Sequence, residues 1–354
     1  MFDTRFEYKK NMDDVVTRHG RLWTKNFTNK ILVKIDIDGL DTVDFHTNLM
    51  KYAPDYKKMF DCYKEFYRKR AKVLDDSIPV ARASLGSAAL SHYFGGKVQF
   101  TPGGAFSRPI ISDLKSFDFS VLKYNPDNKW IKYQMEMIKY FVENARGLFP
   151  VCITEVLMGL IWAEYLLGER MYTDIYDNPK LLMKLVGKSI GFNIKYIDEQ
   201  REYIEKYRDG VFEMFEVWLP GNQIWNGMDT YANCSPDVYL RFGKPFFEEI
   251  GKYYGGQWMH MHSNALYLVK EVARTEYISG ISIWDDFNAP RGFDKLDEIY
   301  RDVNGIPLHI FCTKEELLSG MKDKTLKRNV YYWCNSGVKT IKEANEIMER
   351  VYEY

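Results

Sequence analysis

Residues 256–262 have the sequence GQWMHMH, a short apolar run that ends in two histidines. Three further apolar runs follow along the chain, at 278–284 (ISGISIW), 306–312 (IPLHIFC) and 329–334 (NVYYWC). Runs of this length, rich in β-branched and aromatic residues, are typical of buried strands. Each run leads to a helix, or to a loop before a helix, so the pattern predicts parallel strands joined by helical crossovers.

Helix-start patterns support this alternation. Thr313 with Glu316, and Thr340 with Glu343, have the spacing of a capping box. Four strand and helix units fall after residue 255, and 354 residues are enough for a decorated eight-fold barrel. No glycine-rich phosphate fingerprint follows any of the four runs, which disfavours an open nucleotide-binding sheet. We therefore predict an α/β fold, specifically a single (β/α)8 TIM barrel.

The chain ahead of these runs has less regular patterns. Alternation over 30–38 predicts a half-exposed strand, 56–73 a helix and 97–100 a short strand. Asn178 before Pro179, and Ser235 before Pro236, predict two further helix starts.

Composition limits the class of partner. The 49 basic residues balance the 49 acidic ones and no basic run stands out, which argues against nucleic acid or an anionic membrane surface. The apolar stretch 148–168 is interrupted by Pro150, Glu155 and Glu164, so it does not predict a membrane span. Five widely spaced cysteines and a charged amino terminus predict a cytoplasmic protein without disulfides, and we expect a small-molecule substrate.

Potential metal ligands follow the predicted strands. His260 and His262 lie two residues apart and therefore point to the same side of their strand. Asp285 and Cys334 end two of the later strands, and parallel strands end at one edge of a sheet. Imidazole, thiolate and carboxylate are zinc ligands, so His260, His262 and Cys334 predict a zinc site, with Asp285 as a labile fourth ligand. Asp285 and Asp286 are alternatively a general acid or base.

The same residues also have simpler explanations. The two histidines form hydrogen bonds within a barrel mouth in that case, Cys334 is a small apolar core residue, and Asp285 caps the following helix.

Four further residues are candidates for the site. Tyr165 presents a hydroxyl to a ligand or belongs to the core, and Asp229 is catalytic or shapes a turn. Arg82 and Arg108 flank a glycine-rich region and bind a substrate or cofactor carboxylate, or lie on the surface.

Several segments resemble the uroporphyrinogen decarboxylase superfamily, which includes the zinc-dependent methylcobamide:thiol methyltransferases. The resemblance covers roughly residues 45 to 354. It is carried by Lys51 to Tyr56, Gly95 to Phe100, Ala163 to Gly168 with its Tyr165, Asp229 to Pro236, and Asn329 to Val351. It implies an N-terminal extension over 1–45, packed on a barrel over 46–354.

Within that superfamily the resemblance favours the methyltransferase branch. Thr47 and Lys51 stand where the decarboxylases carry two substrate-binding arginines. His260 and Cys334 match zinc ligands of the methyltransferases, and His262 stands in the place of their first cysteine. The resemblance thus implies zinc, a thiol or similar small acceptor, and a corrinoid carried by a partner protein.

Two other functions stay open at this stage. One is decarboxylation of an acidic small molecule, and the other is a non-catalytic role as a binding or partner subunit. For the oligomeric state, a homodimer is one possibility.

Overall fold

The computed structural model describes residues 6–23, 31–41, 49–101 and 104–354. Its central feature is a six-stranded parallel sheet with the order β1-β12-β11-β10-β9-β8. The strands are β1 (Leu32–Ile35), β8 (Ile224–Gly227), β9 (Gln257–His262), β10 (Ile278–Trp284), β11 (Leu308–Thr313) and β12 (Val330–Ser336). The four strands predicted after residue 255 and their parallel pairing are therefore confirmed.

Three smaller sheets complete the strand inventory of the described residues. A parallel pair joins β2 (Ala81–Arg82) and β5 (Val151–Cys152). Two antiparallel hairpins are formed by β3 (Val98–Thr101) with β4 (Gly104–Ser107), and by β6 (Gly210–Glu213) with β7 (Val217–Pro220). No ladder pairing joins the six-stranded sheet to the β2-β5 pair in the part of the chain that the structure describes.

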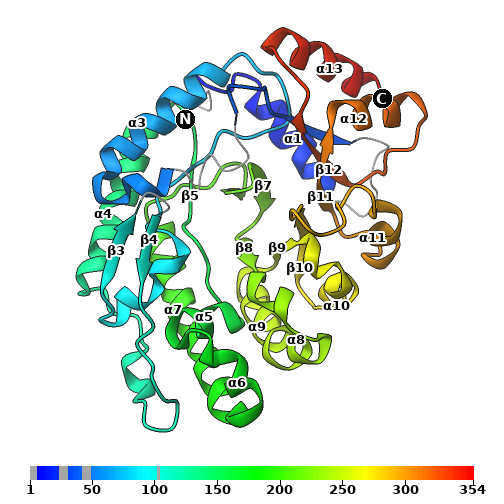
Figure 1. Ribbon diagram of the computed structural model, residues 1–354. Coiled ribbons are helices and arrows are strands. Elements are labelled where there is room, and N and C mark those ends of the chain that lie inside the picture. Colours follow the sequence, from blue (N-terminus) through cyan, green and yellow to red (C-terminus); the bar gives the residue numbers. More distant parts are fainter. Residues whose placement is uncertain (1–5, 24–30, 42–48, 102–103) are drawn as a thin grey trace.

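Most of the helices lie outside the arc of strands, whereas β7 lies inside it and α1 (Met12–Leu22) packs beside β7 (Figure 1). The other α-helices are α3 (Tyr56–Arg70), α4 (Lys129–Ala145), α5 (Gly159–Leu167), α6 (Arg170–Asp177), α7 (Pro179–Arg201), α8 (Pro236–Phe242), α9 (Lys244–Tyr254), α10 (Val269–Ala273), α11 (Leu296–Asp302), α12 (Lys314–Lys322) and α13 (Ile341–Glu353). Short 3-10 helices are η1 (Met50–Asp55), η2 (Ser87–Phe94), η3 (Phe119–Val121), η4 (Asp229–Asn233) and η5 (Ser263–Leu268). None of the helices in these described ranges is long and apolar enough to cross a membrane.

The helix-start predictions differ in how well the side chains fulfil them. Thr313 and Glu316 form the complete reciprocal box at the start of α12. At α13, Thr340 accepts from the Glu343 amide, but the Glu343 carboxylate accepts from Lys339 N at 2.8 Å. Helix α7 begins after Asn178 without a side-chain cap, because the Asn178 amide donates back to Asp174.

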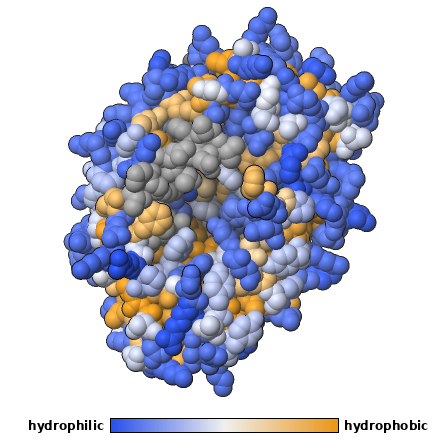
Figure 2. Space-filling view, viewed as in Figure 1, coloured by the Kyte–Doolittle hydropathy of each residue, from blue (hydrophilic) through white to orange (hydrophobic). Residues whose placement is uncertain are grey.

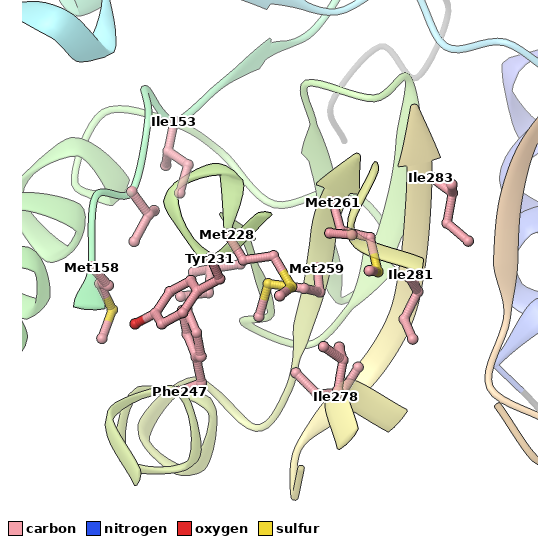
Figure 3. Packing of buried hydrophobic residues seen from close by; sticks show 14 of the residues in the cluster. Ile153, Met158, Met228, Tyr231, Phe247, Met259, Met261, Ile278, Ile281 and Ile283 are labelled. Carbon is pink, nitrogen blue, oxygen red and sulfur yellow. The ribbon is translucent and has the colours of Figure 1, made fainter. Parts of the chain in front are cut away.

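The six-stranded sheet separates two cores. On its outer face Met259, Met261, Ile281 and Ile283 pack with residues of the surrounding helices, such as Phe247 of α9 (Figure 3). On its inner face the alternate residues pack against the β6-β7 hairpin and Leu22 of α1. These inner residues include Leu32, Trp225, Trp258 and Tyr331. A side chain near the end of β9 therefore faces either the helices or the hairpin, according to its position parity.

Buried carboxylates satisfy the free edge of β1. Asp76 Oδ2 accepts from Val33 N and Asp75 Oδ2 accepts from Ile35 N, both at 2.9 Å. Lys9 pairs with Asp75 at 2.8 Å, and Arg70 does so at 3.0 Å. The edge amides thus have acceptors without a neighbouring strand, and each acceptor is balanced by a cation.

Part of the predicted amino-terminal extension belongs to the central sheet. Residues 32–35, which the sequence assigns to the 1–45 extension, form β1 and pair with β12 over its whole length. All four are buried, whereas the alternation predicted a half-exposed strand, because both faces of the sheet are covered. The predicted boundary at residues 45 and 46, and Thr47, lie outside the described residues.

Candidate functional site

His260 and His262 point from the inner face of β9 toward one another. Their Nε2 atoms lie 3.3 Å apart. The ring of Phe215, from the turn between β6 and β7, stacks on His260 with centroids 5.2 Å apart, and Trp284 at the end of β10 meets its edge. Burial lowers the pKa of His260 to about 4, so this imidazole is neutral at pH 7 and has a lone pair to offer.

Asp229 completes a group of three possible ligands. It begins η4, directly after β8, and its Oδ1 lies 3.5 Å from His260 Nε2 and 3.7 Å from His262 Nε2. Its side chain is 57% exposed, so one side of the group is open to solvent. The sequence analysis lists Asp229 only among the further candidates, because nothing in its local pattern indicates that it lies near the histidines.

The spacing of these three atoms suits a small divalent cation. Ligand atoms about 2.1 Å from an ion at tetrahedral angles are separated by about 3.4 Å. The three observed separations are 3.3, 3.5 and 3.7 Å. Two neutral imidazoles and one carboxylate are also a donor set that zinc and other first-row metals accept. The group therefore fits such an ion and leaves a coordination position free.

Asp286 holds the ring of His262. Its Oδ1 lies 2.8 Å from His262 Nδ1, and its Oδ2 accepts from Asn264 N at 3.1 Å. The Asp286 amide in turn donates to Ser263 Oγ at 2.9 Å. Because a carboxylate accepts from Nδ1–H, the Nε2 lone pair of His262 faces His260 and Asp229.

The neighbouring Asp285, the predicted fourth ligand or acid, has a different environment. Its Oδ1 accepts from Gly292 N at 2.7 Å and its Oδ2 accepts from Arg291 Nε at 3.4 Å. It therefore shapes the loop after β10, and Asp286 is the carboxylate that meets the histidines. The alternation of side chains explains this, since Trp284 and Asp286 share one direction and Asp285 has the other.

Cys334 does not join the histidines. It pairs in register with Cys312 of β11, and both side chains are buried in the core between the sheet and the helices. Burial raises the pKa of Cys312 well above its usual value, with Cys334 as the next cause. The residue of β12 on the inner face is Trp333, one position earlier. The side chain beside the two histidines is Asp229, where the sequence analysis expected the Cys334 thiolate.

The two arginines are separated by the fold. Arg82 lines the same cavity as the histidines, but its guanidinium pairs with Glu155 at 3.0 Å. Arg108 is exposed near the end of the β3-β4 hairpin, where its carbonyl accepts from Ser91 Oγ at 2.7 Å. The structure thus places one cation at the site and gives it a partner from the chain itself.

A cavity of about 300 Å³ opens beside Asp229, His260 and His262, which line part of it. Its walls are mainly apolar and aromatic and include Met214, Phe215, Trp225, Trp284 and the predicted Tyr165 of α5. On the face of the molecule seen in Figure 2, mostly hydrophilic side chains form the outline, and hydrophobic side chains gather toward the middle and lower part. The cavity has the size and lining of a small-molecule site.

Sequence reasoning missed two groups of site residues. Trp284 lies two residues before Asp286 on the same strand face, so the alternation used for the histidines would have found it. Met214 and Phe215 lie in a turn without glycine, proline or asparagine, and no turn pattern announces the hairpin that carries them.

The chain matches no protein-family model, and it matches no curated protein.

Proposed function

We propose that this chain is a metal-dependent enzyme on a closed (β/α)8 barrel. In this proposal Asp229, His260 and His262 bind a divalent cation, zinc in the first instance. The reaction is transfer of a methyl group from a corrinoid, carried by a partner protein, to a thiol or similar small acceptor. With a thiol, the sulfur–carbon bond would form as the cobalt–carbon bond breaks, the electron pair of that bond would stay with the corrinoid, and the thiol proton would go to solvent. The observation that carries the proposal is the convergence of three ligand atoms with separations of 3.3 to 3.7 Å at the edge of a cavity.

The residues of the chain prepare this site before any ion binds. Asp286 orients His262 through Nδ1, and burial under Phe215 and Trp284 keeps His260 neutral. Asp229 supplies one negative charge on the open side of the group. A zinc ion bound there would supply Lewis acidity and lower the pKa of a thiol.

Methyl transfer itself is supported by the resemblance to the thiol methyltransferases at His260, whereas Cys334, the other matching ligand, lies outside the group. Decarboxylation of a polyacidic molecule has less support, because Arg82 is already paired with Glu155. Substrate carboxylates would have to compete with that buried partner.

Metal analysis and a methyl-transfer assay test the proposal together. Purified protein should contain about one zinc per chain, and Asp229→Asn and His262→Ala should each lose most of it. Zinc-loaded protein should demethylate methylcobalamin in the presence of a thiol, with the thioether detected by mass spectrometry. A protein that carries no metal in any preparation would contradict the metal site.

Turnover separates the remaining alternatives. Metal binding without any methyl transfer would contradict the proposed reaction and favour a binding subunit. Release of carbon dioxide from an acidic substrate, unaffected by Asp229→Asn, would favour the decarboxylase.

A further inference from the structure

We infer that the acceptor has an uncharged apolar group beside its thiol, and that the turn of the β6-β7 hairpin selects it. This inference rests on the proposed function and names the class of acceptor that the cavity takes. The hairpin enters the inner core and its turn, Met214 to Glu216, reaches the candidate site. Met214 and Phe215 both line the cavity.

The turn is held in place by contacts on three sides. Lys34 of β1 pairs with Glu216 at 2.9 Å, and both side chains are buried. Phe215 stacks on His260, and Met214 Sδ lies 3.1 Å from Arg82 Nη1. Glu216 has a φ of 59°, a backbone conformation that costs energy outside glycine and persists only where the surroundings hold it. The wall that Phe215 forms is therefore part of the fold rather than a free loop.

The charges around the cavity argue for a neutral acceptor. Among the described residues that line it, the charged groups are Arg82, Glu155 and Asp229. Arg82 and Glu155 neutralise each other. A divalent cation with Asp229 then has one net positive charge, which a single thiolate cancels, and the Asp286 carboxylate behind His262 is a further negative charge nearby. A second negative charge on the acceptor would be desolvated in this cavity without an unpaired cation.

The walls argue for an apolar group. Phe215, Trp225 and Trp284 form an aromatic cluster in which Phe215 lies 5.6 Å from Trp225 and 6.0 Å from Trp284, centroid to centroid. Leu157 and Ile161 add aliphatic surface. Such a lining stabilises an aromatic or aliphatic ligand by removing its apolar surface from water.

Calorimetric titration of the zinc-loaded full chain with matched thiols tests the inference. Phenylmethanethiol should bind at least about tenfold more tightly than 2-mercaptoethanol, since burial of about two methylene groups already supplies that ratio. It should also bind at least about tenfold more tightly than 4-(mercaptomethyl)benzoate, because the carboxylate would be buried without an unpaired cation. Phe215→Ala should shift the preference toward naphthylmethanethiol by about tenfold relative to phenylmethanethiol, because it enlarges the cavity. Met214→Ala should shift it in the same direction without touching His260.

Phe212→Ala is the matched control, because Phe212 belongs to the same hairpin and is equally buried but does not line this cavity. Equal binding of the benzoate and the uncharged thiol, or an equal shift in the Phe212 variant, would overturn the inference. Zinc content is measured for every variant, so that loss of metal is not mistaken for loss of the wall.

Toluene separates this inference from the proposed function. It has no thiol, so its binding to metal-free protein reports apolar cavities without the metal. Dependence on Phe215 then assigns the binding to this cavity, and dependence on Phe212 assigns it to a second cavity that Phe212 lines. Toluene binding that Phe215→Ala alters, in a protein that never binds zinc, would contradict the proposed function and keep the apolar site. Zinc binding with no effect of Phe215→Ala on any ligand would contradict the inference and keep the metal site.

Discussion

Asp286→Asn should weaken metal binding by about tenfold to a hundredfold. The carboxylate oxygen lies 2.8 Å from His262 Nδ1. The imidazole ring and a metal bond each add about 2 Å, so the negative charge lies about 7 Å from a bound ion. At an effective dielectric constant of about 40 to 80, suited to a partly exposed pair, a divalent ion and one carboxylate attract each other by about 1.2 to 2.4 kcal/mol. Losses of metal affinity of about this size are typical when a carboxylate that accepts a hydrogen bond from a metal-ligating histidine is removed.

The substitution keeps the shape of the side chain. The new amide oxygen still accepts from His262 Nδ1, but its NH₂ group faces Asn264 N–H, where the carboxylate accepts at 3.1 Å. Zinc affinity at pH 7 is measured by competition with a chromophoric chelator of known affinity.

Asp285→Asn is the control, since the Asp285 carboxylate accepts from Gly292 N and Arg291 Nε and contacts neither histidine. We expect a zinc affinity within about threefold of the wild type there. Unchanged affinity in the Asp286 variant, or equal losses in both variants, would refute the argument that Asp286 tunes the ligand.

Three further predictions concern other parts of the fold. Cys334→Ala should keep the zinc stoichiometry of the wild type and lose about 1 kcal/mol of stability, because the thiol is a core group. Elemental analysis measures the zinc and urea unfolding measures the stability. Zinc loss at wild-type stability would restore Cys334 as a ligand. Lys34→Met should destabilise the fold by about 3 to 5 kcal/mol, since it removes the cation beside buried Glu216. The double variant with Glu216→Gln should recover part of this loss in urea unfolding. A Lys34→Met variant with the wild-type free energy of unfolding would contradict the role of the pair. Burial raises the pKa of Glu213 to about 8, so between about pH 4.5 and 8 the folded chain keeps a proton that the unfolded chain has released, and stability falls as pH rises through this window. Glu213→Gln should therefore gain about 4 kcal/mol over the wild type at pH 8 and nothing at pH 4.5, and a gain that does not depend on pH would contradict the assignment.

Periodicity was enough to predict the part of the fold after residue 255. The strand from Ile278 to Trp284 has the predicted ends, and the complete capping box at Thr313 starts its helix as expected. These elements are local, because a buried strand and a helix cap depend on residues within a few positions of one another. The two-residue spacing of His260 and His262 likewise determined that both imidazoles share one face, since the alternation of a strand is a local property.

Which of the other polar residues meet those histidines is a tertiary matter. Asp229, 31 positions before His260 in the sequence, and Phe215, from a hairpin without turn residues, reach the site only because the sheet and the hairpin bring them there. Cys334 and Asp285 end predicted strands but face away from the group, because one position of parity along a strand exchanges the inner face for the outer one. The sequence alone determined that two imidazoles share one face at the end of a strand. The folded chain decided the partners, since distances between strands and the contents of the inner core depend on packing across the whole molecule.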